Sequence, residues 1–236
     1  MPVSFASNLY LSTGSRADWP RFANWHYRSH KIGLVKSVQL LWHGRPDSRD
    51  PIERLLPDAG PDPNDDGDEP IEPRPVGIAV FVSPPMSLAG RNRFFGRRGR
   101  WGRLEIQAVN RRLCLLQRLV LHPTYRGAGL AGPFLKAACE RTGLDYVETL
   151  SELGESHPVF ERAGFVRVGR VRLDPRRRTR DGHSALFGGN KVTEETFRKS
   201  QHSSPTYFIR QSRPQRRPEM PVDEPENNPT RPIGGF

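Results

Sequence analysis

The chain has 236 residues, of which 35% are apolar, and its formal net charge is +11. This length allows one substantial domain with tails, and the chain contains neither an apolar run of membrane-spanning length nor a recognisable signal peptide. Two separated cysteines, Cys114 and Cys139, argue against a disulfide framework or a zinc site and predict buried thiols in a reduced, cytoplasmic protein.

The positive charge comes mostly from arginine, and the pI is about 10.4. A basic balance favours an anionic partner, such as nucleic acid, a phosphorylated cofactor or an acidic surface. An arginine-rich proteome would produce the same composition without any such partner.

Proline, acidic and small polar residues dominate two segments, 57–75 and 212–236, which we expect to be unfolded. We therefore predict one domain over residues 1–211 and a disordered C-terminal tail over 212–236. An insertion at about 45–75 and a basic loop at 86–103 interrupt the predicted domain.

The first predicted element is a helix from Asp18 to about Ser29, because Asp18 and Pro20 are typical of a first helical turn. Short apolar runs predict strands at 34–43, 76–82, 104–109, 111–121, 144–150, 165–173 and 206–210. Further helices are predicted from the turn after Pro123 to Arg141, over 158–163 and over 190–200. This order predicts an α/β (α+β) fold, a mixed sheet with helices on both faces.

The most informative segment joins an apolar strand, Leu119 to Leu121, to the helix that ends at Arg141. Gly127 and Gly129 lie in the turn between them and allow the backbone to bend and to approach an anion closely. A glycine-rich turn at a helix N-terminus presents unpaired N–H groups and positive potential, which suit a pyrophosphate. The alternative is a strand–turn–helix connection that merely uses glycines.

Two segments resemble the signatures of the GNAT superfamily of acetyl-CoA-dependent N-acetyltransferases. Residues 122–131, His-Pro-Thr-Tyr-Arg-Gly-Ala-Gly-Leu-Ala, resemble its pyrophosphate loop, and 157–165, His-Pro-Val-Phe-Glu-Arg-Ala-Gly-Phe, resemble its second signature. The resemblance implies the GNAT fold, a mixed and mostly antiparallel sheet flanked by helices, with a splayed cofactor-binding strand. It covers about residues 10–173.

The same resemblance implies acetyl-CoA as the cofactor. Its pyrophosphate would bind the backbone N–H groups of Arg126, Gly127, Ala128, Gly129, Leu130 and Ala131. Its pantetheine arm would pair, like an added strand, with the backbone of Leu119, Val120 and Leu121.

A second likeness concerns His26-Tyr27-Arg28 and Arg118. These residues resemble GNAT-like domains fused to ABC-type ATPases and, more remotely, the phage DNA-modification protein Mom. Both relatives imply a partner that is nucleic acid.

The chain departs from the GNAT pattern at two places. Gln117 and Arg118 stand where many members have a catalytic glutamate, and Phe160 stands where many have a proton-donating tyrosine. Because catalysis in this family depends heavily on positioning, activity can survive both losses.

Other side chains are therefore candidates for the chemistry. Glu148 is a candidate base, Tyr27 a candidate proton donor, and Arg118 either an anchor for an anionic substrate or an ion-pair partner of Glu148. His26 and Ser151 are expected near the cleft. The alternatives are a solvated strand-end charge for Glu148 and core packing for Tyr27. His122, Glu152 and His157 lie near the same segments; we expect the two histidines to relay protons, to cap helices or to pack in the core.

Residues 91–103 form the most basic stretch, with arginines, aromatic residues and no acid. Arginine binds phosphate bidentately and aromatic faces stack on unpaired bases, so this stretch predicts nucleic-acid binding. Its arginines are Arg91, Arg93, Arg97, Arg98, Arg100 and Arg103. A second cluster lies at 176–180. The alternative is a solvated loop whose charge balances the acidic segment Asp58–Glu72.

We therefore expect an acetyl-CoA-dependent acyltransferase that acts on an amine, carried by nucleic acid or by a basic protein, with no metal ion and no membrane. The second hypothesis is a GNAT-fold nucleic-acid-binding module that has lost its chemistry. A third is an enzyme for a small amine, in which the arginines are incidental.

Overall fold

The computed structural model describes residues 8–26, 31–47, 50–57, 71–86, 88–98, 101–152, 154, 156–171 and 205–212. Several predictions from the sequence fall outside these ranges. They concern residues 48–49 and 58–70 of the predicted insertion, the helix at 190–200, the arginine cluster at 176–180, the tail beyond 212, and the side chains of Tyr27 and Arg100. In the described part of that insertion, Glu53–Arg54 form a strand and Arg74 begins another, so the expected loop is partly extended. The predicted domain boundaries stay predictions.

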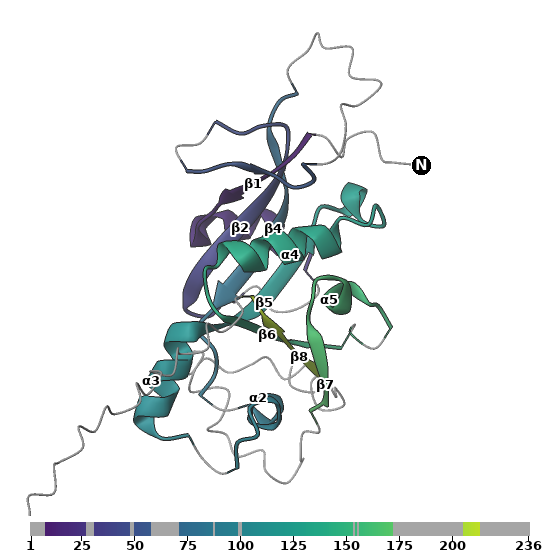
Figure 1. Ribbon diagram of the computed structural model, residues 1–236. Coiled ribbons are helices and arrows are strands. Elements are labelled where there is room, and N and C mark those ends of the chain that lie inside the picture. The colour runs from purple at the N-terminus through teal and green to yellow at the C-terminus, as the bar shows by residue number, and fades with distance from the viewer. Residues whose placement is uncertain are drawn as a thin grey trace, which may run out of the picture.

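The described strands form one sheet of eight in the order β3-β1-β2-β4-β5-β6-β8-β7 (Figure 1). Their bounds are β1 Leu9–Thr13, β2 Val35–His43, β3 Glu53–Arg54, β4 Arg74–Val82, β5 Leu113–Leu121, β6 Tyr146–Ser151, β7 Val166–Arg170 and β8 Thr206–Gln211. Within this described sheet, β5 and β6 pair in parallel and every other neighbouring pair is antiparallel. The expected mixed, mostly antiparallel sheet is confirmed.

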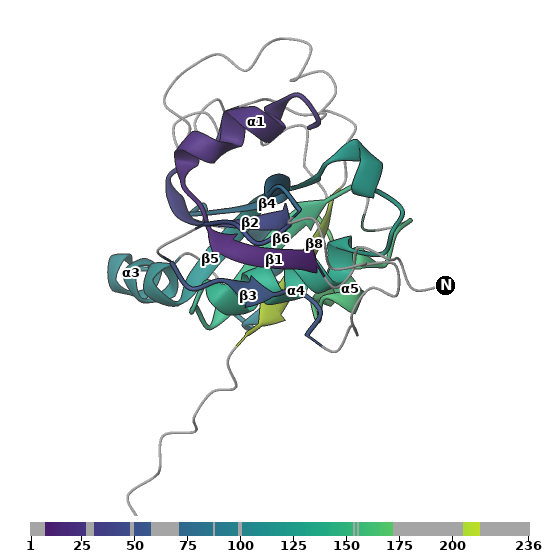
Figure 2. The same cartoon turned by 90° about the horizontal axis from the view of Figure 1, so that it is seen from above.

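Helices cover both faces of the sheet, as the sequence predicts. The described helices are α1 Trp19–Ala23, α2 Ala89–Phe94, α3 Arg103–Arg112, α4 Ala131–Arg141 and α5 Val159–Arg162, with short 3-10 turns η2 Arg16–Asp18 and η3 Pro123–Tyr125. Figure 2 shows α1 on one face and α4 with α5 on the other. None of these described helices has the length and apolar character needed to cross a membrane.

Alternating side chains of the central strands build a core on each face. On β4, Phe81 packs in the cluster that includes Phe134 and Leu135 of α4, whereas Val80 packs in the cluster that includes Trp19 and Phe22 of α1. Successive strand residues point to opposite faces, so one apolar strand supplies both cores. Each fully buried large apolar side chain contributes about 1.5–3 kcal/mol.

Two local predictions were wrong in detail. Residues 104–109 are helical, not extended. The N–H of Gly102, which precedes α3, donates to Glu105 Oε2 at 2.6 Å, and Lys36 Nζ donates to the carbonyl of Asn110 at the other end. The first helix is also shorter than expected. It follows η2, where Ser15 and Asp18 form a capping box, and α1 ends at Ala23.

The parallel pair β5–β6 opens soon after it begins. Backbone pairing covers only Leu113 to Leu115 against Tyr146 to Glu148. At the next position the Thr149 hydroxyl donates to the Leu116 carbonyl at 3.0 Å. A bulge follows at Gln117, because the consecutive β4 residues Phe81 and Val80 pair with Leu116 and Arg118 and leave Gln117 without a partner on β4. Since a bulge bends its strand, the rest of β5 leaves β6. The splayed strand that the GNAT resemblance implies is present.

Candidate functional site

Beyond Gln117, one edge of β5 has no strand partner within the described part of the chain. On the other edge, the His122 N–H donates to the Val76 carbonyl at 2.8 Å. Because bonded and non-bonded pairs alternate in an antiparallel ladder, Val120 directs its backbone groups to β4, while Leu119 and Leu121 direct theirs to the open edge. Of the three residues expected to pair with a pantetheine arm, Leu119 presents both backbone groups to this edge and Val120 presents none. Leu121 presents only its N–H, because its carbonyl accepts from Arg126 Nε.

The turn after β5 presents a run of unpaired backbone donors. The N–H groups of Tyr125 and Arg126 bond within η3, and ordinary helical bonding starts only where the Phe134 N–H donates to the Leu130 carbonyl. Between them, the N–H groups of residues 127–132 have no acceptor among the described residues, and α4 has no side-chain cap. A helix N-terminus with unsatisfied donors carries partial positive charge and suits an anion.

Two glycines give this turn its shape. Gly127 has φ +83° and Gly129 φ +78°, values that other residues adopt only with strain. A Cβ at either position would meet no atom within 4 Å. The glycines are therefore required by the backbone conformation rather than by crowding, and the space beside the turn is open to a ligand.

Arg126 fastens the turn to the rest of the molecule. Its Nε donates to the Leu121 carbonyl at 3.1 Å, and its Nη2 donates to the Trp25 carbonyl at 3.0 Å. Its own N–H donates to the Pro123 carbonyl. Arg126 was expected to supply a donor to the anion, but its N–H is already used, so the run of open donors begins at Gly127.

A polar cluster lies behind the turn. The Tyr125 hydroxyl accepts from Arg74 Nη2 at 2.9 Å and lies 2.6 Å from His43 Nδ1, while burial and the charge of Arg74 lower the pKa of His43. His122 Nδ1 accepts from the Thr124 N–H at 3.3 Å, which is the capping role expected as one alternative. A small pocket of about 210 Å³ adjoins this cluster, lined by Arg74, Pro75, Val76, His122, Thr124 and Tyr125.

Glu148, the candidate base, is wholly buried and fully engaged. Arg91 Nε donates to Oε2 at 3.0 Å and Arg91 Nη2 to Oε1 at 2.5 Å, and the Tyr207 hydroxyl also donates to Oε2, at 2.7 Å. Burial and the negative charge of Glu148 raise the pKa of Tyr207. Glu148 is therefore neither a solvated strand-end charge nor a free carboxylate.

The expected ion pair between Arg118 and Glu148 does not form. The Arg118 guanidinium donates to the carbonyls of Lys31 at 3.0 Å and Gln117 at 2.8 Å, and it lies 5.8 Å from the centre of the Trp19 ring. These contacts fix the segment that follows α1 against β5. The residue is buried, so an anchoring role for a substrate anion stays a prediction without support from its contacts.

The other candidates lie on separate elements. His26 follows α1, half-buried with its ring 5.9 Å from that of Trp19, and Ser151 ends β6, half-buried beside Thr206 of β8. Glu152 and His157 are exposed. Phe160 packs against Phe165 and Phe208 in the core, so the second signature serves packing here.

The basic stretch is only partly a loop, because its two ends are helical. It forms α2, a connection and the start of α3, and it turns one arginine inward. Arg91 is only 2% exposed and bonds Glu148, so it is not accessible to a nucleic-acid phosphate, and its assignment to that role was wrong. Arg93, Arg97, Arg98 and Arg103 are exposed.

Both cysteines are buried, as expected. Burial raises the pKa of the Cys139 thiol to about 12 and also raises that of Cys114, so neither is a thiolate at neutral pH. Among the described residues, no group of three or more His, Cys, Asp or Glu side chains is arranged to hold a metal ion.

A parallel strand pair that opens after three residues, followed by a glycine-rich turn into a helix, is the arrangement that the GNAT resemblance predicts. The sheet, its splayed strand and this turn therefore match the fold that the GNAT resemblance implies. No protein-family model matches the chain, and no curated protein matches it.

Solved structures of acetyltransferases are similar to this chain, though weakly. A chimaera of the spermidine N-acetyltransferase SpeG from Vibrio cholerae and hSSAT is 11% identical, with a TM-score of 0.42, and the match covers 87% of this chain and 97% of that one. The acetyltransferase AAC(6')-Ib, solved with paromomycin and acetyl-CoA, is 13% identical at TM-score 0.41, over 86% and 93% of the two chains.

A third structure, described as histone acetyltransferase HPA2 and related acetyltransferase from Corynebacterium glutamicum, is 12% identical at TM-score 0.41, over 88% and 98% of the chains. Because these similarities are low, we base the functional proposal on the geometry of this chain.

Proposed function

We propose that this GNAT-type protein is a CoA-thioester-dependent acyltransferase that uses acetyl-CoA to acylate an amine. One observation carries the proposal: the unpaired N–H groups of residues 127–132 lie directly after the open edge of β5. Donors at a helix N-terminus suit a pyrophosphate, and an open strand edge suits the amide groups of an extended pantetheine chain. The empty space beside Gly127 and Gly129 fits this assignment, because a Cβ there would meet no protein atom.

The roles of individual residues follow from their backbone groups. Residues 127–131 would bind the pyrophosphate, and Leu119 and Leu121 would align the pantetheine arm. When bound, acetyl-CoA supplies an activated acyl group to the attacking amine. An N–H of Leu119 or Leu121 would then stabilise the negative charge that develops on the carbonyl oxygen.

Proton transfer needs a donor for the departing thiolate. The Glu148 carboxylate already accepts hydrogen bonds from Arg91 and Tyr207, and the Phe160 side chain has no acidic proton to donate. Tyr27 therefore remains the proposed acid, with His26 as its neighbour in the chain. The rate would depend mainly on holding the amine and the thioester in contact, which alone is able to lower a barrier by several kcal/mol.

The acceptor is proposed to be an amine carried by nucleic acid or by a basic protein. Similar structures are named for spermidine and for aminoglycosides, which are small polyamines. A chain with a net charge of +11 disfavours a free polycation by like-charge repulsion, and favours an amine on a polyanion. A small amine remains the alternative, and it predicts an affinity that hardly changes with salt.

A second candidate function is a nucleic-acid-binding module on this scaffold without catalysis. The burial of Glu148 in an ion pair and of Phe160 in the core favours it. Cofactor binding without turnover of any amine, measured as CoA thiol release over a panel of nucleic acids, basic proteins and small amines, would support this candidate against the enzyme.

The experiment that tests the cofactor site is a thermal-shift titration with acetyl-CoA and CoA. A ligand at a hundred times its Kd adds about 2.7 kcal/mol of stability, so Tm should rise. Gly129→Val should abolish the rise, because its side chain strains the turn and fills the space beside it.

Gly96→Val is the matched control. Gly96 also has a positive φ, +63°, and a Cβ at this position would likewise meet no atom within 4 Å, but Gly96 follows α2, far along the chain from the turn. Gly96→Val should lose similar stability and keep the full acetyl-CoA shift. An unchanged shift in Gly129→Val would refute the assignment of the turn.

A further inference from the structure

The segment 88–112 contains eight arginines and one acidic residue, Glu105. The fold arranges this excess of charge on a surface that has no part in the proposed cofactor site. We define the α2–α3 surface as the exposed side chains of residues 93–98 and 101–112. It lies at the start of β5, whereas the cofactor turn follows the end of β5 (Figure 1).

The helix α3 projects from the domain. None of its ten residues is buried, and Leu104 is 79% exposed. Arg103, Gln107 and Arg111 are spaced by four residues, so they form one outward stripe of about 12 Å along the helix. Lys36 holds the carbonyls of Asn110 and Leu113 at the inner end, which anchors the helix without covering its outer face.

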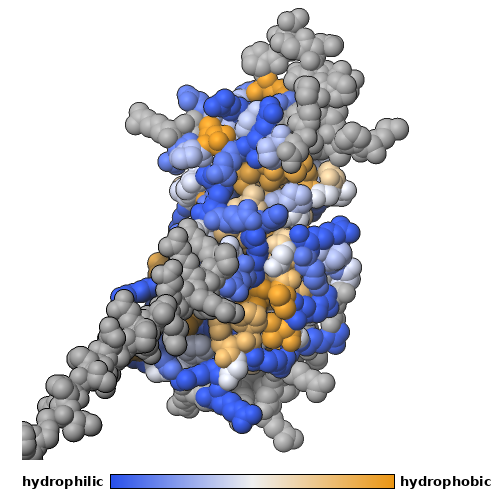
Figure 3. Space-filling model, viewed as in Figure 1, coloured by the Kyte–Doolittle hydropathy of each residue, from blue (hydrophilic) through white to orange (hydrophobic). Residues whose placement is uncertain are grey.

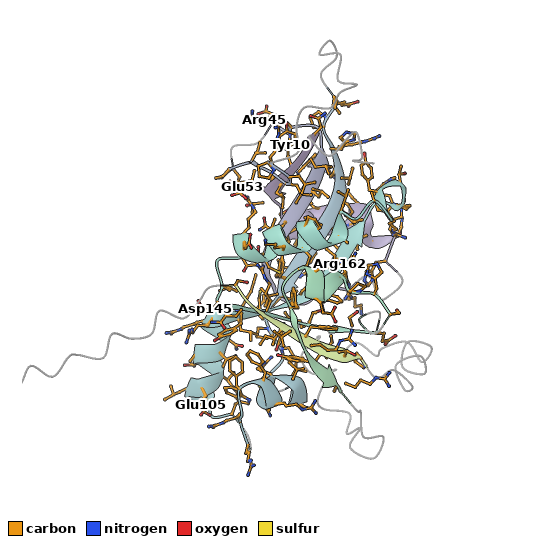
Figure 4. All side chains as sticks on the ribbon, turned by 45° about the vertical axis from the view of Figure 1, so that its right-hand side comes forward. Tyr10, Arg45, Glu53, Glu105, Asp145 and Arg162 are labelled. Carbon is orange, nitrogen blue, oxygen red and sulfur yellow. The ribbon has the colours of Figure 1, made fainter. Side chains whose placement is uncertain are left out.

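The carboxylates near this surface are already paired. Arg97 bonds Glu105 at 2.6 Å, and Arg112 bonds Asp145 at 2.5 Å. Glu105 and Asp145 both lie in the lower half of the view in Figure 4. Within the part of the chain that the structure describes, the side chains of Arg98, Arg103 and Arg111 make no hydrogen bond or ion pair. Hydrophilic residues are visible near the bottom of the space-filling view (Figure 3).

Aromatic rings lie between these cations. Phe94 is 36% and Phe95 37% exposed, with ring centres 5.0 Å apart. Trp101 lies 6.4 Å from Phe95 and has the Arg97 guanidinium 5.7 Å from its ring centre. Partly exposed aromatic faces among arginines suit unpaired bases, whereas a duplex offers mainly phosphates, and a lipid surface would favour longer aliphatic side chains.

We propose that the α2–α3 surface binds single-stranded nucleic acid. Arg98, Arg103 and Arg111 contact the phosphates, and the rings of Phe94 and Phe95 stack on bases. The proposal goes beyond acyl transfer and does not depend on it. The arginines proposed to contact nucleic acid therefore differ from those expected from the sequence. Arg91 and Arg97 are left out, because they pair with Glu148 and Glu105, and Arg111 of α3 is added.

The test measures binding of fluorescein-labelled oligo-dT of about 20 nucleotides by anisotropy over a range of salt concentrations. The double variant Arg103→Gln/Arg111→Gln removes two phosphate contacts, so the slope of log K against log salt should become shallower by about 1.4. Phe94→Leu should weaken oligo-dT binding about fivefold or more and leave weak duplex binding almost unchanged.

The matched control is Arg21→Gln/Arg54→Gln, which removes the same charge from exposed positions on α1 and β3. This control should bind oligo-dT almost like the native protein. Equal losses in both double variants would overturn the proposal, because binding would then reflect net charge alone.

Three other outcomes would also overturn it: no binding at low salt, tighter binding to a duplex with no effect of Phe94→Leu, or binding only to phosphatidylserine vesicles. Circular dichroism and urea unfolding establish that each variant is folded. The acetyl-CoA shift should be unchanged in all of them, so a failure here is separate from a failure of the cofactor site.

Discussion

Arg91 of α2 and Glu148 of β6 form a two-bond ion pair in which the side chains are 2% and 0% exposed. Tyr207 of β8 completes the cluster by donating to the same carboxylate. Gly90, the neighbour of Arg91, lies so close to the Tyr207 ring that a Cβ would come within 2.2 Å of it. The cluster therefore fixes α2 on the sheet.

Breaking this pair should destabilise the fold strongly. Glu148→Leu leaves a guanidinium buried without its partner, so we expect a loss of about 3–5 kcal/mol in the free energy of unfolding, measured with urea. The double variant Arg91→Met/Glu148→Leu should recover most of that loss, because an apolar pair of similar volume avoids the uncompensated charge.

The same double variant tests the role of Glu148 in chemistry. If the protein turns over an amine, we expect the folded double variant to keep that activity, because Glu148 is a structural residue. Loss of turnover with native-like stability would show instead that Glu148 acts as a base.

Arg126→Gln should weaken acetyl-CoA binding without unfolding the protein. The guanidinium joins the turn to the carbonyls of Leu121 and Trp25, so its removal leaves the open N–H groups less ordered before binding. We expect a Kd about five to ten times higher by calorimetry, and a loss of about 1–2 kcal/mol of stability for two hydrogen bonds. Arg16→Gln, which removes one long contact to Gly33, is the control and should leave the Kd unchanged.

Stability should fall as the pH is lowered through the range of His43. Burial, and then the charge of Arg74, lower the pKa of His43 below the ordinary value of 6.5. The unfolded chain therefore takes up this proton more readily than the folded one, so stability is complete above pH 6.5 and declines as the pH falls below it. His43→Gln should reduce the difference between Tm at pH 8 and at pH 5.5, and an undiminished difference would assign the effect to other groups.

The conformation of the glycine-rich turn is predictable from the local sequence. Positive φ at Gly127 and Gly129, the absence of an N–H at Pro133 and the amphipathic pattern of α4 all follow from neighbouring residues, because backbone sterics and helical spacing are local properties. The same local reasoning failed at 104–109. There, alternating apolar residues indicate a strand, whereas Lys36, distant in sequence, supports a helix.

The sequence by itself therefore determined the mixed α/β class, the two GNAT-like signatures and the position of the glycine-rich turn. Only the tertiary structure decided which charges face solvent. Arg91 meets Glu148 across 57 positions, and Arg126 meets the Trp25 carbonyl across 101. The cost of burying a charge depends on the partner that the fold brings to it, and no local pattern of residues specifies that partner.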